Sequence, residues 1–306
     1  MSEARKWKNH IGAIFDSVND FDVIECETCG FKHIIPIPSY KELKKVYQEE
    51  YYTKDKPFYL ERHKEDLDWW KLVYSLRFEA FEQRLPEGCR SILDIGSGPG
   101  YFLLQGKNRG WKTLGVEPSA QAAAYSRKMG LEIIEGFFSE QVAASLGFFD
   151  VVHMSEVLEH VPDPQSLIRL VRGQLTADGL VYIVVPNDYN PFQHVLRKVC
   201  GYRPWWVAPP HHINYFNFNS LARLLSNNGF EVISCESTFP IDMFLLMGDN
   251  YVDNDQAGRR CHGLRKTFEL NLAKANNTKL LKKLYQGFVE IGIGREVVII
   301  AGKTGK

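Results

Sequence analysis

Short apolar runs alternate with amphipathic stretches along residues 88–186 of this 306-residue chain. Alternation of this kind predicts repeated strand–helix–strand units, which build a parallel sheet with helices on both faces. Two more apolar runs follow, the first of them after a predicted helix at 219–228. The predicted strands are 91–95, 112–117, 131–135, 149–154, 180–185, 229–235 and 295–301. The pattern therefore predicts an α/β fold built on a seven-stranded, mostly parallel sheet.

Three segments lie outside this strand–helix pattern. The first, residues 1–87, holds two predicted helices, at 39–51 and at about 60–84. The second, residues 187–217, is rich in aromatic residues, prolines and histidines, and the third, residues 239–294, separates the last two strands. Insertions of this length commonly shape substrate pockets or partner surfaces. We therefore expect an N-terminal helical cap region over 1–87 and a main domain over 88–302 that carries helical cap insertions at 187–217 and 239–294.

The bulk composition excludes some classes of partner. Basic and acidic residues number 37 each, so the formal net charge is zero and no overall positive field gathers nucleic acid. No apolar run approaches the ~18 residues of a membrane span, and the polar start of the chain lacks the hydrophobic core of a signal peptide. We therefore expect a cytoplasmic protein with no nucleic-acid partner and no membrane span, in which the six scattered cysteines are reduced.

A glycine-rich turn follows the first strand of the predicted sheet. Gly96, Gly98 and Gly100 stand between that strand and a predicted helix, and glycine lets the backbone take left-handed conformations close to a ligand. The free amide groups at the start of the helix then face the ligand. Glu117 ends the second strand, where its carboxylate can accept hydrogen bonds from both hydroxyls of a ribose. Asp94 lies where a carboxylate would attract a positively charged amino group or sulfonium, so these residues predict a nucleotide-cofactor site.

Three sequence blocks, together with Glu117, resemble class I S-adenosylmethionine-dependent methyltransferases. The blocks are the glycine-rich segment 94–100, the segment 149–164 with Glu156-Val157-Leu158-Glu159-His160, and the turn into the fifth strand at 177–187. The resemblance covers residues 88–302, and a looser likeness to bacterial methyltransferase-domain proteins rests on the segment Cys26-x-x-Cys29-Gly30-Phe31. It implies a Rossmann-like sheet ending in an antiparallel hairpin, S-adenosyl-L-methionine as the cofactor, and a small-molecule acceptor such as a sugar or a quinol.

Two other functions share parts of this pattern. An acidic residue about twenty positions after the glycines is also typical of dinucleotide-binding sites, which makes an NAD-dependent oxidoreductase the first alternative. That site would need a third glycine three positions after the second, where this chain has Tyr101. The second alternative is a non-catalytic binding module with a methyltransferase fold. Loss of the glycines or of the ribose acid would indicate it, and both are intact here.

The resemblance also implies which residues contact the cofactor. Where the family usually places an aspartate for the adenine amino group, this chain has Phe137 and Phe138, which can stack on the adenine ring. The polar contact to adenine must then come from the backbone or from Ser139. The expected cofactor-binding residues are Asp94, Gly96, Ser97, Gly98, Gly100, Tyr101, Phe102, Glu117, Pro118, Ser119, Phe137, Phe138, Ser155, Glu156 and Val157.

Histidines are the candidates for a catalytic base. Methyl transfer to a hydroxyl oxygen requires removal of the acceptor's proton, and a neutral imidazole suits that task near pH 7. The expected catalytic residues are His160, His211 and His212, acting on a small or carrier-linked acceptor, with carbon and nitrogen acceptors left open. His153 lies inside a strand and is expected in the core, whereas Glu159 is expected to be a solvated helix-cap acid. The histidines without motif context, expected at the surface, are His63, His194 and His262.

Cys26 and Cys29 form half of a zinc site. A structural zinc ion needs four ligands, and the sequence has no second Cys-x-x-Cys pair. His33 and His10 could complete a Cys₂His₂ set, since His33 is reachable from Cys29 along a turn. With only two confident ligands, we expect no bound metal and a knuckle-like turn in which the cysteines pack as small apolar side chains.

Adjacent aromatic residues occur at Tyr51-Tyr52, Trp69-Trp70 and Trp205-Trp206. Neighbouring positions on a helix point in different directions. We therefore expect one member of each pair in the core, while the other can wall a substrate pocket.

Overall fold

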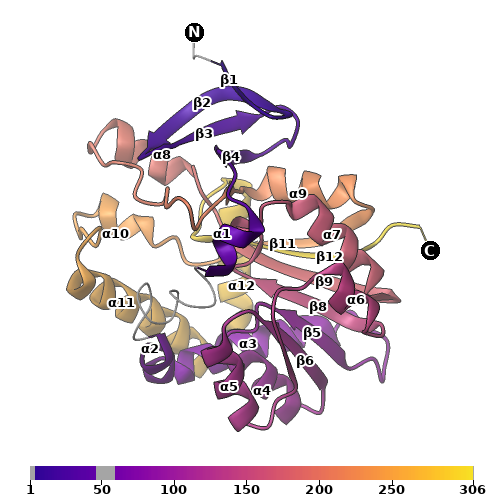
Figure 1. Ribbon diagram of the computed structural model, residues 1–306. Coiled ribbons are helices and arrows are strands. Elements are labelled where there is room, and N and C mark those ends of the chain that lie inside the picture. Colours follow the sequence, from indigo (N-terminus) through magenta and orange to yellow (C-terminus); the bar gives the residue numbers. More distant parts are fainter. Residues whose placement is uncertain (1–3, 46–58, 306) are drawn as a thin grey trace.

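The computed structural model describes residues 4–45 and 59–305 (Figure 1). Of the helix predicted over 39–51, the described part is α1 (Tyr40–Lys45); the rest of it, with the Tyr51-Tyr52 pair, lies outside the described residues. Across the two described ranges, none of the helices combines the length and apolar character that a membrane span requires.

The described residues include a central seven-stranded sheet, as the sequence predicts. Its strands are β5 (Ser91–Ile95), β6 (Lys112–Glu117), β7 (Ile133–Glu135), β8 (Phe149–Ser155), β9 (Leu175–Pro186), β11 (Phe230–Ser237) and β12 (Glu296–Lys303). Their order is β11-β12-β9-β8-β5-β6-β7. β12 is antiparallel to both neighbours and the other pairs are parallel, which confirms the edge hairpin. The strand order reverses between β5 and β8, and open α/β sheets bind ligands at such a point.

Both faces of this sheet are buried under helices. Successive residues of a strand point to opposite faces, so Leu93 packs in one apolar cluster and Ile92 in the other. Burial of each such side chain stabilises the fold by about 1.5–3 kcal/mol. The first face is covered by α7 (Pro164–Gly173) and α9 (Phe218–Asn227), the second by α3 (Leu67–Glu82) and α4 (Tyr101–Asn108). Burial on both faces explains why these strands read as continuous apolar runs.

The other described α-helices lie partly in the predicted insertions. They are α2 (Tyr59–Glu65), α5 (Ala120–Lys128), α6 (Glu140–Ala144), α8 (Pro191–Lys198), α10 (Asp242–Leu246), α11 (Asp255–Lys274) and α12 (Thr278–Glu290). The single helix predicted over about 60–84 is two helices, because Asp66 leaves helical backbone angles (φ −102°, ψ 11°) between α2 and α3. The segment 239–294 contains α10, α11 and α12, in line with the helical insertion expected there.

The prediction of an N-terminal helical cap is wrong for residues 4–35, which form strands. β1 (Ala4–Trp7), β2 (His10–Val18), β3 (Phe21–Cys26), β4 (Lys32–Ile35) and β10 (Asn214–Tyr215) make an antiparallel sheet in the described part of the chain. These strands mix polar and apolar residues, so no long apolar run marks them. The missed signal is the pair of two-residue turns, which place Lys8 and Asn19 at positive φ and are typical of β-hairpins.

This N-terminal sheet is completed by a distant part of the chain. β10 comes from the predicted insertion 187–217 and pairs with β4, so that Asn214 lies opposite His33. Figure 1 shows the sheet of β1–β4 apart from the central sheet. Leu43 of α1 packs in the same apolar cluster as Val23 and Ile34 of that sheet. The N-terminal sheet and the main domain are therefore linked through β10 and α1.

Candidate functional site

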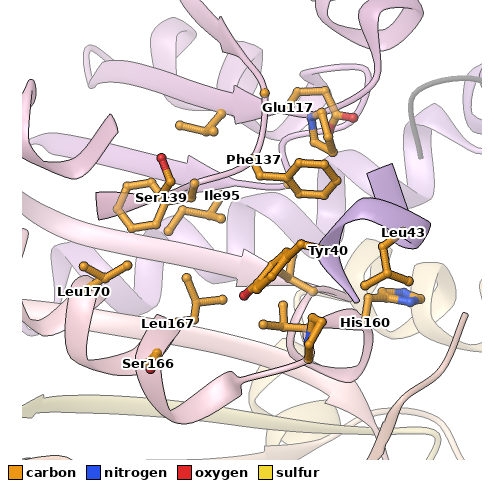
Figure 2. A pocket seen from close by; sticks show the side chains of 18 of the residues that line it. Tyr40, Leu43, Ile95, Glu117, Phe137, Ser139, His160, Ser166, Leu167 and Leu170 are labelled. Atoms are coloured by element: carbon orange, nitrogen blue, oxygen red, sulfur yellow. The ribbon is translucent and has the colours of Figure 1, made fainter. Parts of the chain in front are cut away.

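A cavity of about 460 Å³ opens at the carboxyl ends of β5, β6 and β8 (Figure 2). Its walls are the glycine-rich turn, the ends of β6 and β8, the segment 136–140, α7, and α1 from the N-terminal region. Of the residues expected to bind a cofactor, those that line the cavity are Gly96, Gly98, Glu117, Pro118, Phe137, Phe138, Ser155, Glu156 and Val157. The fold thus gathers segments that are far apart in the sequence around one cavity.

The glycine-rich turn has the conformation that the sequence predicts. Gly96, Gly98 and Gly100 have φ values of +74°, +53° and +78°, which lie in the left-handed region that favours glycine. A Cβ atom on Gly96 would lie 2.7 Å from Val157 Cγ2, and one on Gly100 would lie 2.6 Å from Leu131 Cδ1. The turn therefore needs glycine both for its backbone angles and for the close approach of its neighbours.

Glu117 is a buried carboxyl group on the wall of the cavity. Its Oε2 accepts a hydrogen bond from Gly98 N and its Oε1 accepts one from Ser119 N, each at 2.8 Å. Burial raises the pKa of this carboxyl to about 7, although the two backbone hydrogen bonds act in the opposite direction. A carboxylate offers about four acceptor sites, so Glu117 can accept two further hydrogen bonds from a ligand.

Asp94 lies behind the cavity rather than on its wall. Its Oδ1 is 2.6 Å from His153 Nδ1, and Arg77 Nη1 lies 2.9 Å from His153 Nε2. Because a guanidinium can only donate, His153 Nε2 accepts and Nδ1–H donates to Asp94. Burial lowers the pKa of His153, which keeps the ring neutral between the two charges. His153 is thus a hydrogen-bonded core residue, as predicted, and Asp94 has a partner that the sequence did not indicate.

Other expected cofactor contacts serve packing or capping in the structure and do not line the cavity; they are Ser97, Gly100, Tyr101, Phe102 and Ser119. The ring of Phe102 stacks on His153 with 3.9 Å between centroids. The hydroxyl of Tyr101 lies 2.7 Å from that of Tyr125. Ser119 caps α5 by accepting a hydrogen bond from Ala122 N.

The three histidines proposed as bases come together, but only His160 among them lines the cavity. His160 Nδ1 lies 2.8 Å from the carbonyl oxygen of His211, and the rings of His160 and His212 meet edge to face at 4.9 Å. A carbonyl only accepts, so Nδ1 of His160 carries the proton, and Nε2 lies 3.5 Å from Oε1 of Glu159. His211 and His212 lie on the loop that positions His160.

That loop is attached to the end of β8 by further hydrogen bonds. Asn214 Nδ2 donates to the carbonyls of Leu158 (2.8 Å) and Val161 (2.7 Å), and Ile213 N donates to the carbonyl of Glu159 (2.7 Å). The position of His160 in the wall therefore depends on residues 211–214, more than fifty positions later in the chain.

The expectation that Glu159 is a solvated helix-cap acid is wrong. Its side chain is fully buried in the short 3₁₀ helix Leu158–His160. Burial, followed by the charge of Glu156, raises the pKa of Glu159 well above its usual range. Glu156 itself takes a left-handed backbone conformation (φ +57°), which is uncommon for a residue other than glycine and concentrates at functional sites.

The surface placement of His63 is also wrong. The residue is 6 % exposed and its ring stacks against Trp70 (4.9 Å) and Tyr101 (4.5 Å). Burial lowers the pKa of His63 to about 4. His262 is half-buried and bonded to Asp66, whereas His194 is exposed as expected. Sequence context alone did not reveal these tertiary neighbours.

Tyr40 and Leu43 of α1 also line the cavity, which the sequence did not predict (Figure 2). The helix was recognisable, because Ser39 and Glu42 exchange hydrogen bonds as an N-terminal cap. Its position over the cavity depends on Leu43 packing against the N-terminal sheet. Residues of α7 that line the opposite wall were likewise not anticipated; they are Ser166, Leu167 and Leu170.

A smaller cavity of about 130 Å³ shares Ser155 and Glu156 with the first one. It lies between α3, the edge of the central sheet and the insertion 239–294. Polar side chains from all three line it, among them Arg77, Arg265, Glu236, Glu269, Glu296 and Tyr285. Trp69 and Trp70 line it too, and Trp69 is the buried member of that pair. The pair at 205–206 packs with the N-terminal sheet instead.

The known proteins that this chain resembles are methyltransferases. A family described as a methyltransferase domain matches residues 50–235, more than half of the chain. Over 128 residues the chain is 32% identical to the ubiquinone biosynthesis O-methyltransferase of Actinobacillus pleuropneumoniae, covering 38% of this chain and 54% of that protein. Over 151 residues it is 24% identical to the C-methyltransferase NovU of Streptomyces niveus, covering 46% and 33%. The chain thus spans between a third and about half the length of these relatives.

Solved structures with a similar arrangement include a SAM dependent methyltransferase from Archaeoglobus fulgidus, with a TM-score of 0.49 and 19% identity. That match covers 76% of this chain and 94% of the other. The geranyl diphosphate C-methyltransferase of Streptomyces coelicolor gives a TM-score of 0.47 and 14% identity, with 75% and 77% covered.

Proposed function

Because this chain belongs to the methyltransferase domain family, we propose that it transfers a methyl group from S-adenosyl-L-methionine to a small or carrier-linked acceptor. The observation that carries this proposal is the cavity in which the glycine-rich turn, Glu117 and the pair Phe137 and Phe138 share one space. When bound, S-adenosylmethionine supplies a methyl group on a positively charged sulfur, which is activated for in-line displacement.

The residues of the cavity suit this cofactor. Glu117 retains acceptor capacity for the two ribose hydroxyls, and Phe137 and Phe138 offer aromatic faces or edges to the adenine ring. A volume of about 460 Å³ falls within the roughly 300–1,000 Å³ of small-molecule sites. Of the acidic residues at the methionine end, Glu156 lines the cavity and attracts the positive charge directly, while Asp94 contributes its charge from behind His153.

The acceptor binds where the two cavities meet, beside Ser155 and Glu156. The smaller cavity offers carboxylates, guanidinium groups and a tyrosine hydroxyl next to the Trp69 and Trp70 rings. A polyhydroxylated acceptor such as a sugar matches that lining better than a quinol, because charged and polar side chains from α3, the central sheet and the insertion 239–294 surround it. His160 is the proposed base: Nδ1 is held by the carbonyl of His211, so the proton of the acceptor hydroxyl goes to Nε2, which lies 3.5 Å from Oε1 of the buried Glu159.

Calorimetric titration of the purified chain with S-adenosylmethionine and with NAD⁺ tests the cofactor. We expect binding of the former only, and Glu117→Ala should weaken it by the ~1.5–3 kcal/mol of a hydrogen bond to a charged acceptor. Binding of NAD⁺ alone would identify an oxidoreductase instead. Methyl transfer from labelled cofactor to a panel of sugars and quinols, read by mass spectrometry, then tests the acceptor; labelling of quinols only would contradict the sugar assignment.

A further inference from the structure

Four potential metal ligands converge in the N-terminal sheet, away from the cofactor cavity. His10 lies at the start of β2, Cys26 at the end of β3, Cys29 in the following turn and His33 in β4. One ligand atom from each of the four lies within 4.8 Å of the others. We propose that these residues bind one zinc ion, and that this ion fixes the N-terminal sheet against the main domain.

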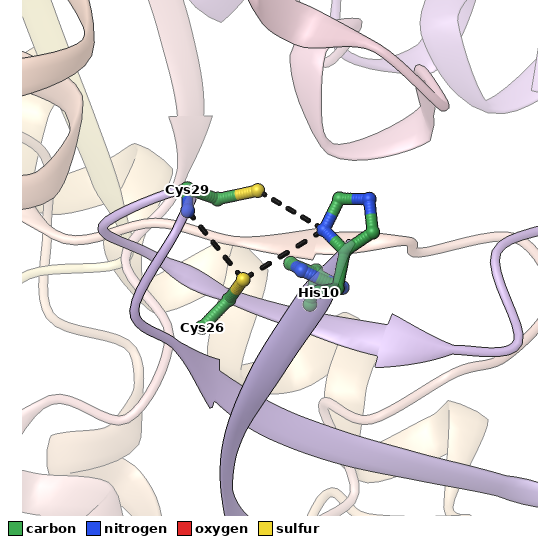
Figure 3. Close-up of side chains that lie close together, drawn as sticks. His10, Cys26 and Cys29 are labelled. Atoms are coloured by element: carbon green, nitrogen blue, oxygen red, sulfur yellow. Dashed lines mark hydrogen bonds between the residues drawn. The ribbon is translucent and has the colours of Figure 1, made fainter. Parts of the chain in front are cut away.

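The distances suit a tetrahedral ion. His10 Nδ1 lies 3.3 Å from Cys29 Sγ and 3.7 Å from Cys26 Sγ. Figure 3 marks both contacts with dashed lines. Zinc bonds of about 2.3 Å to sulfur and about 2.0–2.1 Å to nitrogen, at tetrahedral angles, place neighbouring ligand atoms about 3.3–3.8 Å apart. Two thiolates with two imidazoles form a ligand set typical of zinc.

The turn at Cys26–Gly30 presents both sulfur atoms on one side. Cys29 N lies 3.4 Å from Cys26 Sγ, so a backbone N–H points at the sulfur and can stabilise its thiolate. Gly30 N donates to the carbonyl of Cys26 (2.9 Å), and Gly30 takes a left-handed conformation (φ +76°). Cys26 N donates to the carbonyl of Phe31, which returns the chain to β4.

His33 provides independent evidence for a ligand. The residue is 1 % exposed, and its Nδ1 lies 2.9 Å from the carbonyl oxygen of Ile34. Since a carbonyl only accepts, Nδ1 carries the proton and Nε2 has a free lone pair. Within the described part of the chain, this buried Nε2 has no hydrogen-bond partner. Metal-binding histidines typically donate their other ring N–H to such a carbonyl, so an ion would satisfy an otherwise costly buried acceptor.

The location of the site indicates what the ion does. His33 pairs with Asn214 across β4 and β10, and the side chain of Asn214 binds the carbonyls of Leu158 and Val161 on either side of His160. Phe31, between the site and β4, packs on Phe216 with 4.9 Å between ring centroids. The ion would thus connect three strands that brace the wall of the cofactor cavity. The sequence led us to expect no metal because it offered two confident ligands, and folding supplies the other two.

Elemental analysis of the full chain, purified without chelator, tests the proposal. We expect close to one zinc ion per chain, and loss of it in Cys26→Ser and His33→Ala. Exposed residues of the same types provide matched controls, and Cys200→Ser and His194→Ala should keep the metal. If the parent chain holds far less than one zinc ion after incubation with zinc chloride and gel filtration, or if His33→Ala keeps its full content, the proposal is wrong.

A spectroscopic measurement on the unaltered chain tests the proposal even if the variants fail to fold. Replacement of the metal by Co²⁺ should give the visible absorption and the thiolate charge-transfer bands of a tetrahedral site with sulfur ligands. A spectrum of octahedral cobalt without charge-transfer bands would overturn the proposal, because it would place the ion elsewhere.

Discussion

At the scale of single residues, Glu117 is a buried carboxyl group to which we assign a ligand-binding role that needs its charge. Its oxygens accept hydrogen bonds from Gly98 N and Ser119 N, yet burial raises its pKa to about 7. The carboxyl is therefore partly protonated at neutral pH in the free protein. In the proposed binding mode the ribose hydroxyls donate to the ionised form, so cofactor binding would favour that form and release a proton.

We accordingly expect the affinity for S-adenosylmethionine to fall as the pH is lowered through 7. The raised pKa means that the ionised fraction, and with it the affinity, drops about tenfold between pH 8 and pH 6. Titration calorimetry at three pH values measures this. Glu117→Gln should bind more weakly and lose most of this pH dependence, whereas an equal affinity of the parent chain at pH 6 and pH 8 would refute the role of Glu117.

His160 and His211 give a second prediction at this scale. His160→Ala should lower turnover by ~10²–10⁴-fold with cofactor affinity kept, because it removes a positioned base. His211 holds His160 through its main-chain carbonyl, which alanine retains, so His211→Ala should turn over within a few-fold of the parent. His212→Ala, which removes only the ring packed against His160, should lie between them. If all three variants turn over like the parent, the reaction uses no histidine base.

At the scale of elements, the turn between β5 and α4 shows where sequence reasoning works well. Three glycines after an apolar strand predicted the left-handed turn, and the structure confirms their positive φ angles. The strands of the central sheet were predictable for a related reason, since burial on both faces demands unbroken apolar runs. The burial of Glu159 and of His63 was not predicted, because it depends on neighbours far along the chain, Ile213 and Tyr101 respectively, that no local pattern reveals.

The glycine-rich turn also allows a test that separates backbone strain from loss of the site. Gly98→Val should abolish cofactor binding while leaving most of the helical circular dichroism, because a β-branched residue disfavours φ of +53° and would occupy ligand space. Gly110→Val is the matched control, since Gly110 has φ of +83° with open space around it and does not line the cavity. Native affinity in Gly98→Val, or equal loss in both variants, would contradict a ligand-binding role for the turn.

At the scale of the whole molecule, hydrogen bonds of Asn214 join the N-terminal sheet to the main domain beside the cofactor cavity. Asn214 belongs to β10 of that sheet, is almost fully buried, and donates to Leu158 and Val161 at the cavity. This junction could not be predicted from the sequence, because β10 has two residues and its partner β4 lies in a region that we expected to be helical. Only the assembled fold shows that both segments meet.

Asn214→Ala should therefore lower the free energy of unfolding by about 1–3 kcal/mol, because it leaves buried carbonyls without a donor. Urea denaturation measures the change. Asn228→Ala provides the comparison: Asn228 is half-buried at the C-terminal end of α9, where its Nδ2 donates to Leu224 O and its Oδ1 accepts a long, exposed hydrogen bond from Arg169 (3.4 Å), so its loss should cost less. Equal losses of unfolding free energy in the two variants would mean that the hydrogen bonds of Asn214 stabilise the fold no more than that of Asn228.

The pairing of β4 with β10 has a consequence for biosynthesis. While the chain is being translated, β4 can form its hairpin with β3, but its other edge stays open until residues 214–215 have left the ribosome. An open strand edge is a template for pairing with another chain. By then the ribosome has also made β5, β6, β7, β8 and β9, so the nascent N-terminal strands must avoid foreign partners throughout the synthesis of the parallel strands of the central sheet.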